Sequence, residues 1–257
     1  MPEAINLDLV RIATPADVRP AAEAMRNIAQ GVFDCRVGAC HNIATKQPMR
    51  DADDQVLATS VFGWGDSEED RWYLVPQLAL HSPLPTACRY ESEPFWCNAS
   101  GIRTPHHNPL LASISLANFE QRCMAHAAIV VPVHMPFGHI GAVSFVPRDV
   151  NHVDLADVFD AHGDMLGLYA RTFISGYQRV MIAPERLPVG AILSKREVEC
   201  LRWAAIGKTD QEISMIMSRS RATVRFHIHN AATKLDAVNR SQTVFKATQL
   251  GYIGLNH

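Results

Sequence analysis

The fold of this chain is decided by residues 194–235, with the sequence SKREVECLRWAAIGKTDQEISMIMSRSRATVRFHIHNAATKL. Ser194 and Thr209 each stand three residues before a glutamate, which is the spacing of a helix capping box, and Ser220 is a third N-cap residue. Gly207 stands where a helix end in the left-handed conformation favours glycine. The pattern predicts two short helices, a tight turn and a third helix, which is the helix-turn-helix arrangement.

The third of these helices has two distinct faces. Its core side is predicted from apolar residues at steps of four, three and four, namely Val224, Ile228, Ala231 and Leu235. Arg221, Arg225 and His229 recur at steps of four on another face. Such a basic face is suited to the major groove of DNA, where side chains meet base edges and phosphates. A fourth helix is predicted from Asn239, and self-association through it would pair two copies on half-sites about one helical turn apart.

Charge divides the chain near residues 184–190, where two prolines and one glycine predict a linker. Residues 193–257 hold ten basic and five acidic side chains, a net charge of +5, whereas residues 1–192 hold 14 basic and 21 acidic ones, a net charge of -7. The formal net charge of -2 is therefore a cancellation between a basic and an acidic segment. We expect domains at residues 1–183 and 193–257, joined by a linker at 184–192.

The larger segment predicts a domain of mixed α and β structure. Helical spacing is found at residues 15–29, 68–80, 110–125 and 153–181, and strand-like apolar runs at 32–43, 129–133 and 140–146. Pro83 is expected to end the second helix, because the residue before a proline is driven out of helical conformation. The predicted fold class is α+β: an α-β-α sandwich with a mainly antiparallel sheet, linked to an all-α four-helix domain.

Composition excludes several classes of protein. With 47% hydrophobic and 19% charged residues, the chain is neither disordered nor a coiled coil. No apolar run reaches the ~18 residues of a membrane span, and the first nine residues lack the features of a secretory signal. We therefore expect a cytoplasmic protein that does not bind membranes. The six cysteines form no CxxC pair, so we expect buried thiols, no metal site and no cofactor.

The C-terminal segment closely resembles the LuxR-type DNA-binding domain over about a quarter of the chain. The matching residues include Leu193-Ser194-Lys195-Arg196-Glu197, Leu201-Arg202-Trp203, Gly207-Lys208-Thr209, Glu212-Ile213, Thr223-Val224, Lys234-Leu235 and Asn239-Arg240. The resemblance implies that Trp203, Lys208 and Ser220 lie near the DNA backbone. It also implies that Arg225 and His229 stand at positions that read bases.

Tyr73 stands nine residues before Ser82-Pro83, Pro94-Phe95-Trp96 follows them, and two strands are predicted around residues 127–134 and 141–144. At these positions, residues 15–180 resemble the acyl-homoserine-lactone-binding domain of quorum-sensing LuxR regulators, although fewer positions match than in the C-terminal segment. The resemblance implies a ligand pocket formed by Trp72, Tyr73, Ser82, Trp96 and Ser144. Ser82 stands where the family has the aspartate that accepts the ligand's amide N–H, and a hydroxyl is a weaker acceptor than a carboxylate.

Three functions are open at this point. The first is a transcription regulator that binds a palindromic operator in double-stranded DNA as a homodimer and senses an acyl-homoserine lactone or a related amphipathic signal. The second is a regulator that binds DNA without a ligand, because Ser82 departs from the family's pocket. The third is a lactone-processing enzyme that uses Ser144 or Cys123 with His126 or His134. No nucleophile elbow or spaced triad accompanies these residues, so we expect no enzyme.

Overall fold

The computed structural model describes residues 5–45, 47–65, 82–182 and 192–254. The chain forms two compact units, one made of most of the first 183 residues and the other mainly of residues 184–257. Each unit is described by itself below. Within the described ranges, no helix is long and apolar enough to cross a membrane.

A five-stranded antiparallel sheet is the centre of the first unit, with the strand order β1-β5-β4-β2-β3. Its strands are β1 (Cys35–Cys40), β2 (Phe95–Asn98), β3 (Gly101–Arg103), β4 (Ala127–His134) and β5 (Ile140–Pro147). The turn between β4 and β5 contains the 3-10 turn η4 (Pro136–Gly138). Ser144 of β5 lies opposite Gly38 on one side and Val130 on the other. The two strands predicted from short apolar runs are confirmed as this β4–β5 pair.

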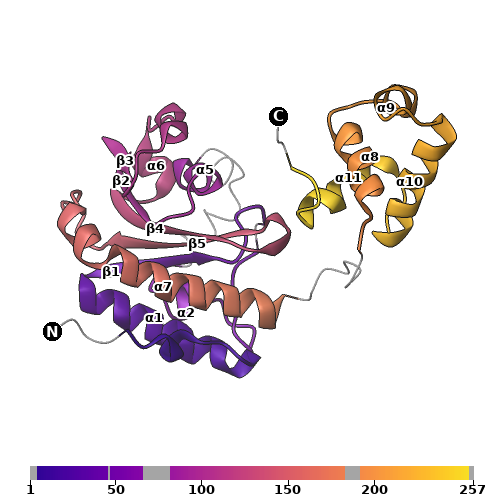
Figure 1. The fold of residues 1–257 in the computed structure, drawn as a ribbon. Helices are drawn as coiled ribbons and strands as arrows, with labels where there is room; N and C mark the ends of the chain where they lie inside the picture. The colour runs from indigo at the N-terminus through magenta and orange to yellow at the C-terminus, as the bar shows by residue number, and fades with distance from the viewer. Residues whose placement is uncertain (1–4, 46, 66–81, 183–191, 255–257) are drawn as a thin grey trace. The chain divides into compact units, whose positions relative to one another are not determined.

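Two long helices, α1 (Val18–Val32) and α7 (Ala156–Met181), cover one face of the sheet (Figure 1). The 3-10 turns η1 (Leu7–Val10) and η2 (Pro15–Asp17) and the short helix α2 (Leu57–Ser60) complete this layer. The strand side chains in this core include Val37, Trp96, Ile129, Val131, Val143 and Phe145. Both long helices agree with the helical spacing of the sequence, which confirms that part of the prediction.

The opposite face of the sheet is covered by α5 (Pro83–Tyr90), the 3-10 turn η3 (Pro109–Ser113) and α6 (Phe119–Cys123) (Figure 1). The strand side chains of this second core are Phe95, Cys97, Ala128, Val130 and Val146. The two cores alternate along each strand, because successive strand side chains point to opposite faces. Helices on both faces of an antiparallel sheet are the predicted α-β-α sandwich, which is confirmed.

The continuous helix predicted at residues 110–125 is wrong. The structure instead has η3 and α6, separated by Asn118 with a φ of 53°. Met124, with a φ of 56°, follows α6 at its C-terminal end. A residue in the left-handed region cannot continue a right-handed helix, so the apolar spacing alone gave the wrong element.

Whether Pro83 also ends a helix stays a prediction. The helix expected at residues 68–80 lies outside the described residues. Pro83 begins α5, and Ser82, with an extended ψ of 133°, is its N-cap residue. Proline suits this first position because its missing N–H would have no helical partner there. Within the described residues, the extended conformation of Ser82 falls at the start of α5.

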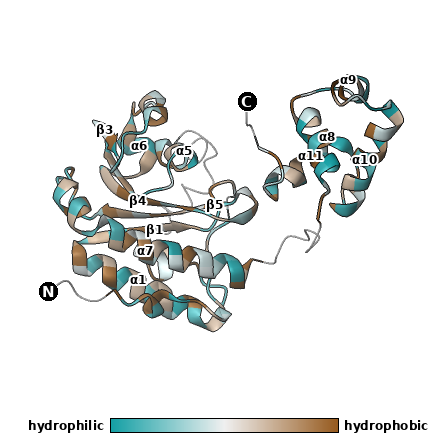
Figure 2. Ribbon diagram, in the orientation of Figure 1, coloured by the Kyte–Doolittle hydropathy of each residue, from teal (hydrophilic) through white to brown (hydrophobic). Residues whose placement is uncertain are grey.

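The described residues of the second unit form four helices: α8 (Lys195–Ala205), α9 (Asp210–Ile216), α10 (Arg221–Lys234) and α11 (Arg240–Gln249). Capping boxes are present at Ser194 and Thr209, and the hydroxyl of Ser220 accepts a hydrogen bond from the N–H of Thr223. Gly207 has a φ of 86° between the first two helices. The predicted all-α helix-turn-helix unit is thus confirmed, and apolar and polar residues alternate around its helices (Figure 2).

Candidate DNA interface and ligand pocket

The outer face of α10 carries the basic residues that the sequence placed there. Arg221, Arg225 and His229 are exposed and line a surface pocket together with Ala222 and Phe226. The apolar stripe on the other side of α10 is buried, namely Val224, Ile228 and Ala231, followed by Leu235. The predicted separation of two faces is confirmed. Phe226 was not among the predicted site residues, although 60% of it is exposed within this surface.

One carboxylate connects the start of α9 to the two following helices. Oδ1 of Asp210 accepts a hydrogen bond from Nη1 of Arg240, and Oδ2 lies 3.8 Å from Nε of Arg225. Nη2 of Arg240 donates to the carbonyl oxygen of Lys208 at 2.7 Å. Only 19% of the Asp210 side chain is exposed. Sequence reasoning missed Asp210, because no periodic spacing relates it to either arginine.

The other residues expected near the DNA backbone have structural partners of their own. Trp203 is half-buried against the small core of Cys200, Ile213, Val224 and Ile228. Nζ of Lys208 lies 3.6 Å from Oε1 of Glu212, and the hydroxyl of Ser220 caps α10. Their contact with DNA stays a prediction.

The buried carboxylate of Glu197 connects two helices of this unit, α8 and α10. Its Oε2 accepts hydrogen bonds from the N–H of Ser194 at 2.7 Å and from Nζ of Lys234 at 2.8 Å. Burial by itself raises the pKa of Glu197, but the hydrogen bonds from Lys234 and Ser194 outweigh burial and hold that pKa below its ordinary value. The carboxylate is therefore charged at neutral pH and ties α8 to the end of α10.

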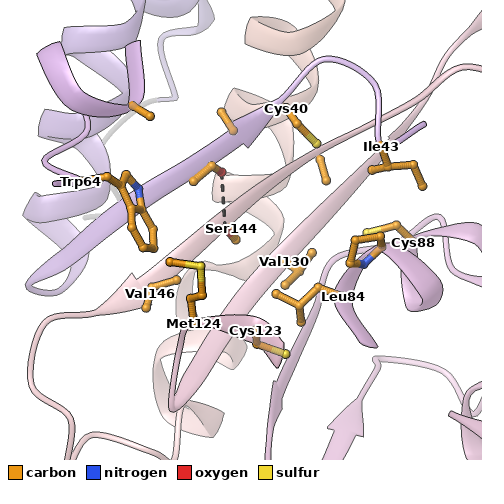
Figure 3. A pocket seen from close by; sticks show the side chains of 15 residues that line it. Cys40, Ile43, Trp64, Leu84, Cys88, Cys123, Met124, Val130, Ser144 and Val146 are labelled. Carbon is orange, nitrogen blue, oxygen red and sulfur yellow. Dashed lines mark hydrogen bonds between the residues drawn. The ribbon is translucent and has the colours of Figure 1, made fainter. Parts of the chain in front are cut away.

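A cavity of about 130 Å³ lies in the first unit, on the face of the sheet that α5 and α6 cover (Figure 3). Its described lining includes Trp64, Leu84, Cys88, Cys123, Val130 and Ser144. Small residues on β1 and β5 leave this space open. A Cβ atom on Gly38 would stand 2.5 Å from Oγ of Ser144, so this hydroxyl would have to shift, whereas the distance of 3.7 Å to Cζ2 of Trp64 would be an ordinary contact.

The thiols around this cavity are uncharged at neutral pH. Burial raises the pKa of Cys40 to about 11 and the pKa of Cys123 to about 12, and it raises the pKa of Cys88 further still. Within the described ranges, no group of three or more histidine, cysteine or acidic residues is placed to hold a metal ion. The sulfur atoms therefore act as apolar lining.

The structure brings only part of the predicted ligand pocket together. Ser144 lines the cavity, whereas Trp72 and Tyr73 lie outside the described residues. Ser82 is fully buried beside the cavity, where its hydroxyl accepts from the N–H of Leu84 at 3.4 Å. Ser82 itself is not a lining residue.

The prediction that Trp96 shares a pocket with Ser144 is wrong for this cavity. Trp96 belongs to the core under α1 and α7, on the other face of the sheet, because its strand neighbours Phe95 and Cys97 occupy the cavity face. Trp64 lines the cavity instead, and its Nε1 donates to the carbonyl oxygen of Val37 at 2.6 Å. Trp64 was not among the predicted site residues.

Comparison with known proteins assigns the second unit to a family. Residues 191–247 match the family described as "Bacterial regulatory proteins, luxR family". The C-terminal part of this chain is therefore a luxR-family helix-turn-helix domain.

Individual curated proteins are similar to part of this chain. The chain is 39% identical over 139 residues to the transcriptional activator protein VanR of Vibrio anguillarum, which is 52% of this chain and 55% of the relative. It is 37% identical over 125 residues to the quorum sensing-dependent transcriptional regulator RpaR of Rhodopseudomonas palustris, which is 49% of this chain and 48% of the relative. The chain thus matches about half the length of these curated relatives.

Solved structures show the same fold over nearly the whole chain. SdiA of Escherichia coli has a TM-score of 0.50 at 20% identity and covers 96% of this chain and 95% of its own. SdiA in complex with octanoyl-rac-glycerol has a TM-score of 0.51 at 21% identity and covers 98% of this chain and 94% of its own. The two-domain architecture is therefore shared.

Proposed function

We propose that this protein is a ligand-responsive transcription regulator, in which the C-terminal unit binds operator DNA and the first unit binds a small signal molecule. The observation that carries the proposal is the exposed basic face of α10, with Arg221, Arg225 and His229, within a luxR-family domain. Arginine and histidine donors on a helix suit base edges and phosphates in a major groove. The contacts with the DNA backbone around this face come from Trp203, Lys208 and Ser220.

The signal is an acyl-homoserine lactone or a related small amphipathic molecule. Two similar proteins support this class, because RpaR is named as quorum sensing-dependent and SdiA has a structure with octanoyl-rac-glycerol. The cavity beside Ser144 is lined mostly by hydrocarbon and sulfur, which suits an apolar chain. A ligand that binds only the folded protein stabilises it by mass action, and this couples the signal to the amount of DNA-competent protein.

Operator binding involves a homodimer on a palindromic site. An apolar surface on and beside α11 supports this part of the proposal, because Phe245 is 60% exposed and Val238 is 86% exposed. Pairing such a surface between two copies would bury it and place two recognition helices on successive half-sites.

The test combines thermal unfolding with DNA binding. Acyl-homoserine lactones of graded chain length are expected to raise the unfolding temperature of the full chain and to strengthen its binding to an operator selected from random-sequence DNA. A chain that binds its operator equally tightly with and without every lactone, and is stabilised by none, would support the ligand-independent regulator.

The contacts of the candidate catalytic residues do not favour the enzyme. Nε2 of His134 lies 3.0 Å from the carbonyl oxygens of Cys88 and Glu91, and Nδ1 of His126 lies 3.0 Å from Oε1 of Glu120. Each histidine is thus held by a partner other than Ser144 or Cys123. Incubation of a lactone with the protein, followed by product analysis, tests the enzyme directly.

A further inference from the structure

We propose that Phe226 reads a thymine in the major groove of the operator, by packing its ring against the C5-methyl group of that base. The inference rests on the proposed function, in which α10 binds operator DNA, and it names the base that one further residue of this helix recognises. Three properties of the side chain support it: its exposure, its basic surroundings, and its lack of hydrogen-bonding groups.

The ring of Phe226 is exposed, although phenylalanine is among the residues most often buried. The structure leaves 60% of this residue exposed, while Val224 and Ile228 on the same helix are buried. Phe226 belongs to neither of the two small cores that the described residues of the C-terminal unit form. Its ring lies edge-on to that of His227, with the two ring centres 5.8 Å apart. Packing within the described part of this unit therefore leaves most of the ring open to a partner.

The charge around the ring indicates what kind of partner fits this surface. Phe226 and Ala222 line the surface pocket on α10 together with Arg221, Arg225 and His229. Two copies of the chain that paired through this surface would bring their arginines together, because a twofold interface places the same patch on both sides. Like charges would then repel each other. DNA phosphates instead complement the arginines, so the surface favours DNA over a second copy.

The chemistry of the ring selects one base. In the major groove, thymine presents a methyl group, whereas adenine, guanine and cytosine present hydrogen-bonding groups there. A phenyl ring set against those polar groups would remove their water without pairing them, which costs affinity.

The place of Phe226 on α10 predicts where this thymine lies. Phe226 directly follows Arg225, which reads bases in the proposed function. A helix rises about 1.5 Å per residue and base pairs are spaced about 3.4 Å apart. The thymine should therefore lie within about two base pairs of the base that Arg225 contacts.

The experiment removes one methyl group at a time from the DNA. The full-length protein selects an operator from random-sequence DNA, and each thymine of that operator is then replaced singly by deoxyuridine, which lacks only the C5-methyl group. Fluorescence anisotropy, with and without acyl-homoserine lactone, gives the affinity for each duplex. We expect one thymine in each half-site to stand out, with a loss of about three- to fivefold on replacement, which is the effect of burying one methyl group.

Phenylalanine variants locate the effect. Phe226→Ala is expected to bind the thymine and deoxyuridine operators equally at that position. Phe226→Gln, which keeps a long side chain without an apolar ring, has the same expected result and takes the place of Phe226→Ala if that variant does not fold. Phe245→Ala is the matched control, because Phe245 is also 60% exposed but lies on α11. This control is expected to keep the preference for thymine, since both DNAs are compared on the same protein.

Two results would overturn the inference. The first is an unaltered protein that binds every deoxyuridine operator as tightly as the thymine operator. The second is a Phe226 variant that keeps the full preference for thymine. The selection step separates this failure from that of the proposed function. A selected operator without a methyl effect at Phe226 rejects the thymine contact and keeps the regulator, whereas the selection of no sequence, with or without lactone, rejects both.

Discussion

Oδ2 of Asp210 lies 3.8 Å from Nε of Arg225, while the other oxygen of the same carboxylate accepts a hydrogen bond from Arg240. Arg225 stands on the exposed face of α10, and 69% of its side chain is exposed. Asp210 belongs to the preceding helix and is itself fixed by Arg240. The helix before the recognition helix therefore restrains the direction of an arginine that the proposed function uses to read bases.

Asp210→Asn is expected to weaken discrimination between operator and scrambled DNA several-fold, because the amide keeps the shape of the side chain but loses the charge that restrains Arg225. Fluorescence anisotropy with both DNAs measures this ratio. A double-mutant cycle with Arg225→Ala separates restraint from damage to the fold. If Asp210→Asn lowers discrimination equally with and without Arg225, the restraint is not the cause.

Arg225→Ala is expected to cost about 1–3 kcal/mol of specific binding and to relax base preference at its contact. Lys208→Ala is expected to weaken binding to all DNA sequences alike and to reduce the dependence of affinity on salt, because the proposed function gives Lys208 a contact with the DNA backbone. Titrations of operator and scrambled DNA at several salt concentrations distinguish the two variants. If each variant lost as much affinity for scrambled DNA as for the operator, α10 would not be the helix that reads bases.

The stability of the C-terminal unit is expected to depend on pH through Glu197. Its pKa is lowered in the folded protein, so the stabilisation is complete above the ordinary value of 4.5 and is lost as pH falls through the folded-state pKa. Glu197→Gln should destabilise the unit by about 1–3 kcal/mol at pH 7, and the difference should shrink in acid. Urea unfolding of both proteins from pH 7 down into acid measures this difference in the free energy of unfolding.

Glu199→Gln is the control for that experiment. Glu199 accepts a hydrogen bond from Arg196 at 2.7 Å, but both side chains of this pair are exposed. An exposed ion pair on one helix contributes about 0.5 kcal/mol or less. If Glu199→Gln lowered the free energy of unfolding as much as Glu197→Gln does, then neither burial nor the contact with Lys234 would explain the destabilisation by Glu197→Gln.

Two tryptophans test which face of the sheet binds the signal. Trp64→Phe removes the donor to the carbonyl oxygen of Val37 and alters the cavity wall, so the gain in unfolding temperature on addition of a bound lactone should fall. Trp96→Phe should lower the stability of the protein without changing that gain, because Trp96 packs under α1 and α7. A reduced gain for Trp96→Phe alone would place the ligand on the opposite face.

Local chemistry explains which elements the sequence could predict. The boxes at Ser194 and Thr209 act within three residues of their own helix, so their spacing alone locates the helix start. The break at Asn118 depends on one backbone angle, which apolar spacing does not report. Pro83 restricts the residue before it whether a helix ends or begins there, and only the following residues distinguish the two.

Contacts between segments that are distant in the sequence explain why the positions of the other site residues could not be predicted. A one-residue difference in strand position decides whether Trp96 or its neighbours face the cavity, and the resemblance does not fix that position. Trp64 reaches the cavity from the segment after α2, through its contact with β1. Asp210 and Arg225 meet only because two helices pack together. These relationships come from tertiary packing, which residue spacing does not encode.

The alternation along β5 separates two sets of side chains. Val143 and Phe145 belong to the core beneath the long helices, whereas Ala142, Ser144 and Val146 line the cavity. In the proposed function, substitutions at Ala142 or Ser144 would alter which molecule is recognised, whereas Val146 also belongs to the second core. One strand thus contributes to the core beneath the long helices with one set of side chains and to the wall of the proposed signal pocket with the other.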